Sequence, residues 1–221
     1  MEKSCSIVSN GTEFAYRVIA TNNNIMVQEL EYKGCKVKID YDSDPESPRE
    51  WDNLGTIYTN NLRHNFDGKS IKDLVRETGH CPDNFDCIPF HLFSKAFIWA
   101  KVYAYEHSGM TIQIAESNPY PDPMWDSYLL GVIAVSKAKA RKEYGWKKVT
   151  PARANKVIEV MKGEIETLDQ CLNGEVYGYI VEDPDGNRMD SCWGYFGDEG
   201  IKQAIEEAKD IIDYYVDGKT N

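Results

Sequence analysis

The chain has no long hydrophobic run, and no stretch approaches the roughly 18–20 apolar residues of a membrane-spanning helix. Its first residues, MEKSCSIVSNG, lack the apolar segment of a secretory signal. The glycine-rich phosphate loops and the G-x-S-x-G nucleophile motif of common enzymes are also missing. We therefore expect a cytoplasmic protein with reduced thiols and no membrane partner. Its sequence motifs do not identify a catalysed reaction.

Positive charge is scarce, because 25 Lys and Arg stand against 36 Asp and Glu, which gives a net charge of −11. The phosphate backbone repels such a chain, so we expect no direct nucleic-acid partner. An acidic surface can instead meet a basic partner, including the nucleic-acid groove of another protein, although acidity also keeps small domains soluble. The 14 Tyr and 5 Trp suit β-rich packing or a protein-binding face.

The pattern of the chain predicts an α+β fold with a mostly antiparallel sheet, about four helices and a single domain spanning 1–221. Strands and hairpins are indicated by alternating or β-rich segments at 14–21, 25–32, 35–41, 97–106, 111–115, 175–182 and 188–196. The continuously apolar 129–135 predicts a strand buried on both faces. Cap signals and apolar spacing predict helices at 71–78, 137–144, 152–172 and 200–216, with Asp198 as the last cap. The proline-rich 118–124 is a candidate sub-domain seam.

The most unusual stretch is DYDSDPESPREWDNLG at 40–55. It concentrates carboxylates around two prolines, which exclude a regular helix or a central strand. Trp51 is the first of the apolar residues that we expect to be buried after the acidic stretch. The stretch is either a solvated, turn-rich connection or a loop that offers several oxygens to a hard cation.

A second group of candidate ligands is His80, Cys81, Cys87 and His91. Two thiolates and two imidazoles could bind zinc tetrahedrally, although the spacing is not that of a standard zinc finger. Ordinary cysteines in a reducing compartment are the alternative interpretation.

Several segments together resemble a family of uncharacterised proteins carried by phages, prophages and mobile elements. The segments are SPREWDNLG, HSG, WDS, RKEYGW, GEVYGYIVED and DSCWG, which span about 42–197. The resemblance makes Asp42, Asp52, His107 and Asp126 the first choice for a shared divalent-metal site.

Small acidic proteins of this kind are similar to anti-CRISPR and other anti-defence proteins. The resemblance implies a protein that binds and blocks a host defence protein, such as a Cas9-type effector, whose nucleic-acid channel is basic. We expect the partner-binding residues to be acidic side chains of the loop and the last helix: Asp44, Glu46, Asp198, Glu199, Glu206, Glu207, Asp210 and Asp213. A metal-dependent hydrolase acting on a phosphoester or nucleotide is the alternative function.

Overall fold

The computed structural model describes residues 3–9, 12–20, 26–60, 63–84, 87–120 and 126–218. The chain forms two compact units, which we describe separately. Unit 1 comprises residues 1–46 and 174–221, and unit 2 comprises residues 47–173. The single-domain expectation stays a prediction. The candidate seam at 118–124 falls inside unit 2, and its residues 121–124 lie outside the described part of the chain.

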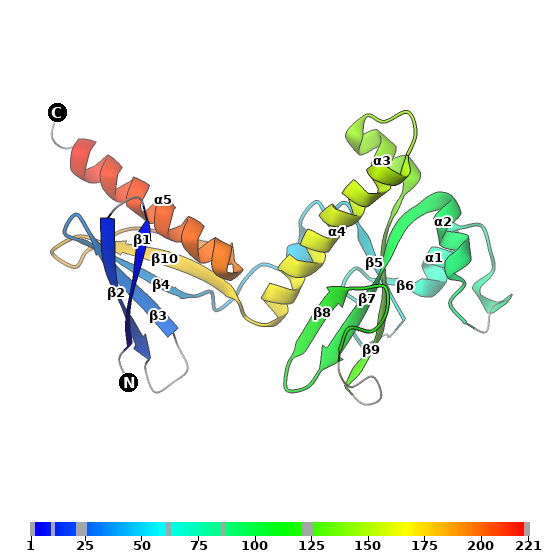
Figure 1. Ribbon diagram of the computed structural model, residues 1–221, viewed down its shortest axis with the longest axis horizontal. Helices are drawn as coiled ribbons and strands as arrows, with labels where there is room; N and C mark the ends of the chain where they lie inside the picture. The colour runs from blue at the N-terminus through cyan, green and yellow to red at the C-terminus, as the bar shows by residue number, and fades with distance from the viewer. Residues whose placement is uncertain are drawn as a thin grey trace. The chain divides into compact units, whose positions relative to one another are not determined.

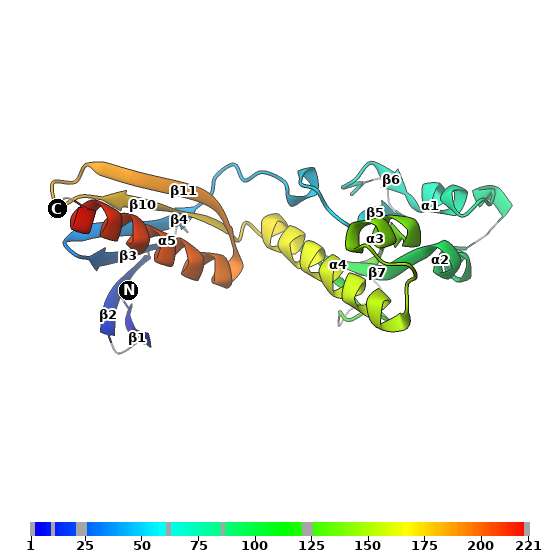
Figure 2. The same ribbon diagram turned by 90° about the horizontal axis from the view of Figure 1, so that it is seen from above.

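Unit 1 is an antiparallel sheet with one long helix (Figures 1 and 2). The spatial order of the strands is β1-β2-β3-β4-β10-β11. Their bounds are β1 Lys3–Ser9, β2 Thr12–Ala20, β3 Met26–Tyr32, β4 Cys35–Tyr41, β10 Val176–Glu182 and β11 Arg188–Phe196. Because β4 pairs directly with β10, for example Tyr41 with Tyr177, unit 2 is inserted between two neighbouring strands.

Helix α5, Gly197–Asp217, covers one face of this sheet. Ala204, Ala208 and Ile212 recur every four residues and are fully buried against Val37 and Tyr179 of the sheet. The expected cap at Asp198 is wrong by two residues, because Phe196 is the N-cap and Asp198 lies in the first turn. A carboxylate in that turn still stabilises the positive end of the helix dipole.

Unit 2 contains a second sheet, in the order β6-β5-β9-β7-β8. Its strands are β5 Thr56–Thr59, β6 Lys69–Ser70, β7 Phe97–Glu106, β8 Met110–Ile114 and β9 Ser127–Ser136. Among the strands described in this unit, only β5 and β6 pair in parallel. The helices are α1 Ile71–Glu77, α2 Phe90–Ala96, α3 Lys137–Tyr144 and α4 Pro151–Leu172, with short 3-10 turns η1 Pro48–Glu50 and η2 Pro82–Asn84.

Strand β9 is continuously apolar because helices cover both faces of this sheet. Ile133 belongs to the core formed with α4, and Val132 belongs to the core formed with α1 and α2. A β-carbon on Gly131 would collide with the carbonyl oxygen of Tyr58, so only glycine allows β5 to pair this closely. The prediction of a strand buried on both faces is confirmed.

The helix starts follow the cap chemistry of the sequence. Ser70 and Asp73 form a reciprocal capping box at α1, Ser136 caps α3, and Thr150 followed by Pro151 begins α4. The α+β class with mostly antiparallel strands is confirmed, and the described residues contain one more α-helix, α2, than we expected. None of the helices in the described part is long and apolar enough to span a bilayer.

Candidate functional site

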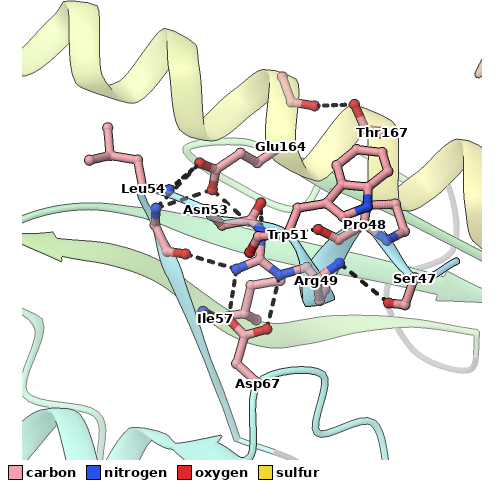
Figure 3. Close-up of polar contacts among 12 residues, drawn as sticks. Ser47, Pro48, Arg49, Trp51, Asn53, Leu54, Ile57, Asp67, Glu164 and Thr167 are labelled. Atoms are coloured by element: carbon pink, nitrogen blue, oxygen red, sulfur yellow. Dashed lines mark hydrogen bonds and ion pairs between the residues drawn. The ribbon is translucent and has the colours of Figure 1, made fainter.

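The SPREWDNLG segment folds around the guanidinium group of Arg49 (Figure 3). The Nε and Nη2 atoms of Arg49 donate to the two carboxylate oxygens of Asp67 at 2.9 and 2.7 Å. Nη2 also donates to the carbonyl of Gly55 at 2.8 Å, and Nη1 donates to Oδ1 of Asn53 at 3.0 Å. Nη1 lies 3.5 Å from Oε2 of Glu164 on α4. We call Arg49, Asn53, Asp67 and Glu164 the Arg49 clamp.

The two carboxylates of the clamp also hold the backbone. Glu164 accepts from the amide of Leu54 at 2.7 Å and from that of Gly55 at 3.1 Å, and Asp67 accepts from the amide of Ile57 at 2.7 Å. The side chain of Arg49 is 4% exposed, and those of Asp67 and Glu164 are each 12% exposed. Burial lowers the pKa of Arg49, but the bond to Asp67 and the charges of Asp67 and Glu164 outweigh it and raise the pKa. The clamp is therefore a structural ion-pair network in which all three guanidinium nitrogens of Arg49 already donate hydrogen bonds.

An open pocket of about 350 Å³ lies beside the clamp. It is lined by Arg49, Trp51, Asp52, Asn53, Gly55, Thr56, Asp67 and Lys69. Trp51 is 43% exposed at its rim. Because the polar groups of the clamp are already bonded to one another, the pocket offers few ligand-binding groups beyond Asp52 and Lys69.

The carboxylates that the sequence groups in one loop are divided between the two units. Asp42 lies in unit 1, where its Oδ1 accepts from the amide of Asp44 at 3.1 Å and closes a turn. Asp52 lies in unit 2 and is exposed at the pocket. The residues that sequence reasoning missed here are Asp67 and Glu164, which are distant in the chain and carry no motif of their own.

Two imidazole–carboxylate pairs lie at the β7–β8 hairpin of unit 2. His107 Nδ1 is 3.2 Å from Oδ2 of Asp126, so this half of the predicted metal set comes together. His64 Nε2 is 3.3 Å from Oε1 of Glu106, the residue next to His107. A hydrogen bond of 2.7 Å from the amide of Glu106 to the carbonyl of Asp126 fixes the hairpin end against β9.

Tyr128 joins the His64–Glu106 pair, since its hydroxyl donates to Oε2 of Glu106 at 3.2 Å. Burial and then the charge of Glu106 raise the pKa of Tyr128 to about 12, so it remains a proton donor at neutral pH. Arg63, which is largely exposed, approaches the same carboxylate at 3.9 Å. This arrangement can hold and transfer a proton. His64, Glu106 and Tyr128 were missed as a group because β7–β9 pairing and the segment between β5 and β6 bring together residues that are distant in the chain.

The alternative zinc residues lie at the other end of unit 2, around α1, η2 and α2. His80 Nδ1 interacts with Thr78 Oγ1 at 3.1 Å and with the Thr78 carbonyl at 3.0 Å. Cys81, Cys87 and His91 are exposed, and the two cysteines are not joined by a disulfide. Across the described ranges, no three His, Cys, Asp or Glu side chains form a group that could hold a metal ion. Both metal sets stay predictions.

Negative charge is distributed unevenly between the two units. Unit 1 carries 20 Asp and Glu against nine Lys and Arg, whereas unit 2 carries 16 of each. The whole net charge of −11 therefore belongs to unit 1. On α5, the exposed carboxylates are Asp198, Glu199, Glu206 and Asp210, together with Asp217.

Two of the predicted partner-binding carboxylates are engaged within unit 1. Glu207 accepts from the hydroxyl of Tyr195 at 2.5 Å and from Nε2 of the Gln203 side chain at 2.9 Å. Asp213 lies 2.8 Å from the ammonium of Lys33 and accepts from Tyr32 at 3.3 Å. In the loop, Asp44 and Glu46 are exposed. Comparisons of the chain with protein-family models, with curated proteins and with solved structures gave no match.

Proposed function

We propose that unit 1 binds a basic protein surface and that the protein thereby blocks a host defence protein, with a Cas9-type effector as the first candidate. The observation that carries the proposal is the concentration of the net charge of −11 in unit 1. Complementary charge steers a partner toward such a surface and disfavours partners of like charge. Effector proteins hold their guide and target in strongly basic channels, which suit an acidic unit.

The binding surface in this proposal is the acidic face of α5, defined as Asp198, Glu199, Glu206 and Asp210. These residues lie on the solvent side of the helix, opposite the buried Ala204, Ala208 and Ile212. The last turn of the helix carries Tyr214, which is 76% exposed, and the exposed Tyr215 and Val216. Exposed tyrosines next to charged groups are typical of the centres of protein interfaces. The face thus combines electrostatic steering with an apolar anchor.

Co-purification with a panel of Cas9-type effectors tests the proposal. We expect a stable complex with one member, loss of DNA binding or cleavage by that member, and weaker binding at high salt. The double variant Glu206→Lys, Asp210→Lys should lower the affinity at least about tenfold. The matched control is Glu159→Lys, Glu166→Lys, which makes the same charge change on the exposed side of α4.

No complex and no loss of interference in cells, across the whole panel, would defeat the effector version of the proposal. A complex that tolerates the α5 variant as well as the α4 control would remove the acidic face from it. A pull-down from host lysate with the wild-type chain and the α5 variant side by side would then identify the partner.

Hydrolysis of a phosphoester or nucleotide is the second candidate function, and the paired imidazoles and carboxylates at the β7–β8 hairpin favour it. His107 and Asp126 would help to hold a metal ion that activates a water molecule, and His64 with Glu106 could accept the proton of that water. The test is turnover of nucleic acids and cyclic nucleotides with and without EDTA. Activity should fall at least about a hundredfold in His107→Ala and His64→Ala but not in the control His91→Ala. Equal turnover in all of these variants would reject this site.

A further inference from the structure

Unit 2 has equal numbers of acidic and basic residues, but positive charge is concentrated in one stretch of it. Between residues 137 and 156 there are eight Lys and Arg and a single acid, Glu143. The same stretch contains Tyr144 and Trp146. It covers α3, the connecting loop and the first turns of α4, which Figures 1 and 2 show side by side at one end of the unit.

These positive charges are not neutralised within the fold. Among the described residues, none of the eight forms an ion pair with a carboxylate, whereas Lys33, Lys36, Lys38, Arg49, Lys69, Lys72, Arg76 and Lys202 all do. Lys137 and Lys139 donate to backbone carbonyls of Ser94 and Asn53 and have a structural role. The remaining six, Arg141, Lys142, Lys147, Lys148, Arg153 and Lys156, form what we call the basic patch.

Two cations of the basic patch, Arg153 and Lys156, are held in place by neighbouring aromatic rings. The rings of Tyr144 and Trp146 stack with centroids 4.4 Å apart. Arg153 lies over the Trp146 ring at 5.0 Å, and Lys156 lies over the Tyr144 ring at 5.7 Å. Arg153 also donates to the carbonyl of Lys148 at 2.8 Å, and the amide of Trp146 donates to the carbonyl of Arg141 at 2.9 Å. Arg153 and Lys156 are therefore preorganised, which reduces the entropy that these two side chains lose when an anion binds.

Fold stability does not explain this arrangement. Arg141 and Lys142 suit the negative end of α3, but α4 has no acidic residue in its first turn and begins beside Lys147, Lys148 and Arg153. Cations at the positive end of a helix dipole are unfavourable unless an anion joins them. Exposed Arg141, Lys142, Lys147, Lys148 and Lys156 present several charges at once, as a polyanion requires.

We propose that the basic patch binds the phosphate backbone of a nucleic acid without reading its sequence. The stacked rings are covered by their own cations, so the contacts go to phosphates rather than to bases. The inference is independent of the proposed function of unit 1 and differs from the expectation, drawn from net charge alone, that the chain has no direct nucleic-acid partner. At physiological salt, charges more than about 8 Å apart are largely screened from one another. The charge close to the binding surface therefore matters more for binding than the net charge of the whole chain.

Fluorescence anisotropy with the full-length chain and labelled 20-nucleotide DNA and RNA, single-stranded and duplex, tests the proposal. We expect binding at 50 mM NaCl with a dissociation constant of about 100 µM or tighter. For duplex DNA, the slope of log Kobs against log[NaCl] should be about −3 to −5, because each phosphate contact contributes about −0.9. The four probes distinguish DNA from RNA and paired from unpaired strands.

The variant Lys147→Ala, Lys148→Ala removes two exposed side chains that make no hydrogen bond or ion pair in the described part of the chain. It should weaken binding at least about tenfold at 100 mM NaCl and reduce the magnitude of the salt slope by about 2. The matched control Lys72→Ala, Lys95→Ala removes two exposed lysines elsewhere in unit 2 and should change the affinity less than about twofold. No binding to any probe at 50 mM NaCl would overturn the proposal. Equal losses in the two variants would overturn it too, as would binding to polyglutamate but not to nucleic acid.

Discussion

At the scale of single residues, Arg49 is the group on which the start of unit 2 depends. It compensates two carboxylates that are mostly buried and that also bind backbone amides. We expect Arg49→Ala to lower the free energy of unfolding of unit 2 by about 3–5 kcal/mol, because it leaves two buried charges unpaired. Arg49→Lys should recover part of this loss, since it keeps the charge but not the bidentate geometry.

Denaturant unfolding measures this effect, and Arg63→Ala is the control. Arg63 forms a long contact with Glu106 in a largely exposed position, so its removal should cost less than about 1 kcal/mol. A loss below about 1 kcal/mol for Arg49→Ala would contradict the role of the clamp.

The hydrogen bond from Tyr195 to Glu207 predicts how the stability of unit 1 depends on pH. The bond from Tyr195, followed by that from Gln203, lowers the pKa of Glu207 below its ordinary 4.5, so its contribution is present above that value and is lost as the pH falls through the lowered pKa. Burial and then the bond to Glu207 raise the pKa of Tyr195 above its ordinary 10.0, so its contribution is present below 10 and is lost at higher pH.

Tyr195→Phe should therefore destabilise unit 1 by about 2 kcal/mol at pH 7. The difference from wild type should shrink below about pH 4 and above about pH 10. Unfolding curves across that range measure it, with the exposed Tyr214→Phe as control. A constant difference at every pH would show that the bond does not titrate.

At the scale of elements, two glycines of unit 2 should respond in opposite ways to alanine. Gly163 lies within α4, and a β-carbon there meets no atom within 4 Å, so Gly163→Ala should stabilise the unit by about 0.5–1 kcal/mol. Gly131→Ala would push β9 away from β5 and should cost about 1–3 kcal/mol or more. Thermal melts of the two variants measure this, and the same sign for both would contradict the packing described.

Elements whose signals are local could be predicted from the sequence. The caps Ser70, Ser136 and Thr150 each lie within three residues of the amide that they bind, so their helices were placed correctly. Helix α2 was missed because its N-cap is Pro89, which makes no side-chain cap hydrogen bond. The Arg49–Glu164 contact and the β4–β10 pairing connect residues more than 100 positions apart, and periodicity carries no information about such distances.

At the scale of the whole molecule, the two units should be separable. Residues 42 and 176 are joined by a backbone hydrogen bond of 2.8 Å, so a short Gly-Ser linker from 46 to 174 can replace unit 2. We expect this shortened chain and the fragment 47–173 each to fold with one cooperative transition. In anion exchange the shortened chain should bind much more strongly than the fragment, because it retains all the net negative charge. An unfolded product in either case would contradict the division.

The insertion of unit 2 between paired strands also imposes an order on folding. During synthesis β1 to β4 are made first, but β10, the second partner of β4, emerges only after the 127 residues of unit 2. Closing so long a flexible loop is entropically costly, whereas a folded unit 2 shortens the chain that must be closed. The clamp ties the first residues of unit 2 to Glu164, two turns before α4 ends, and so brings both exits of the unit closer together. A mutation at Arg49 should thus delay the completion of a sheet to which Arg49 does not belong.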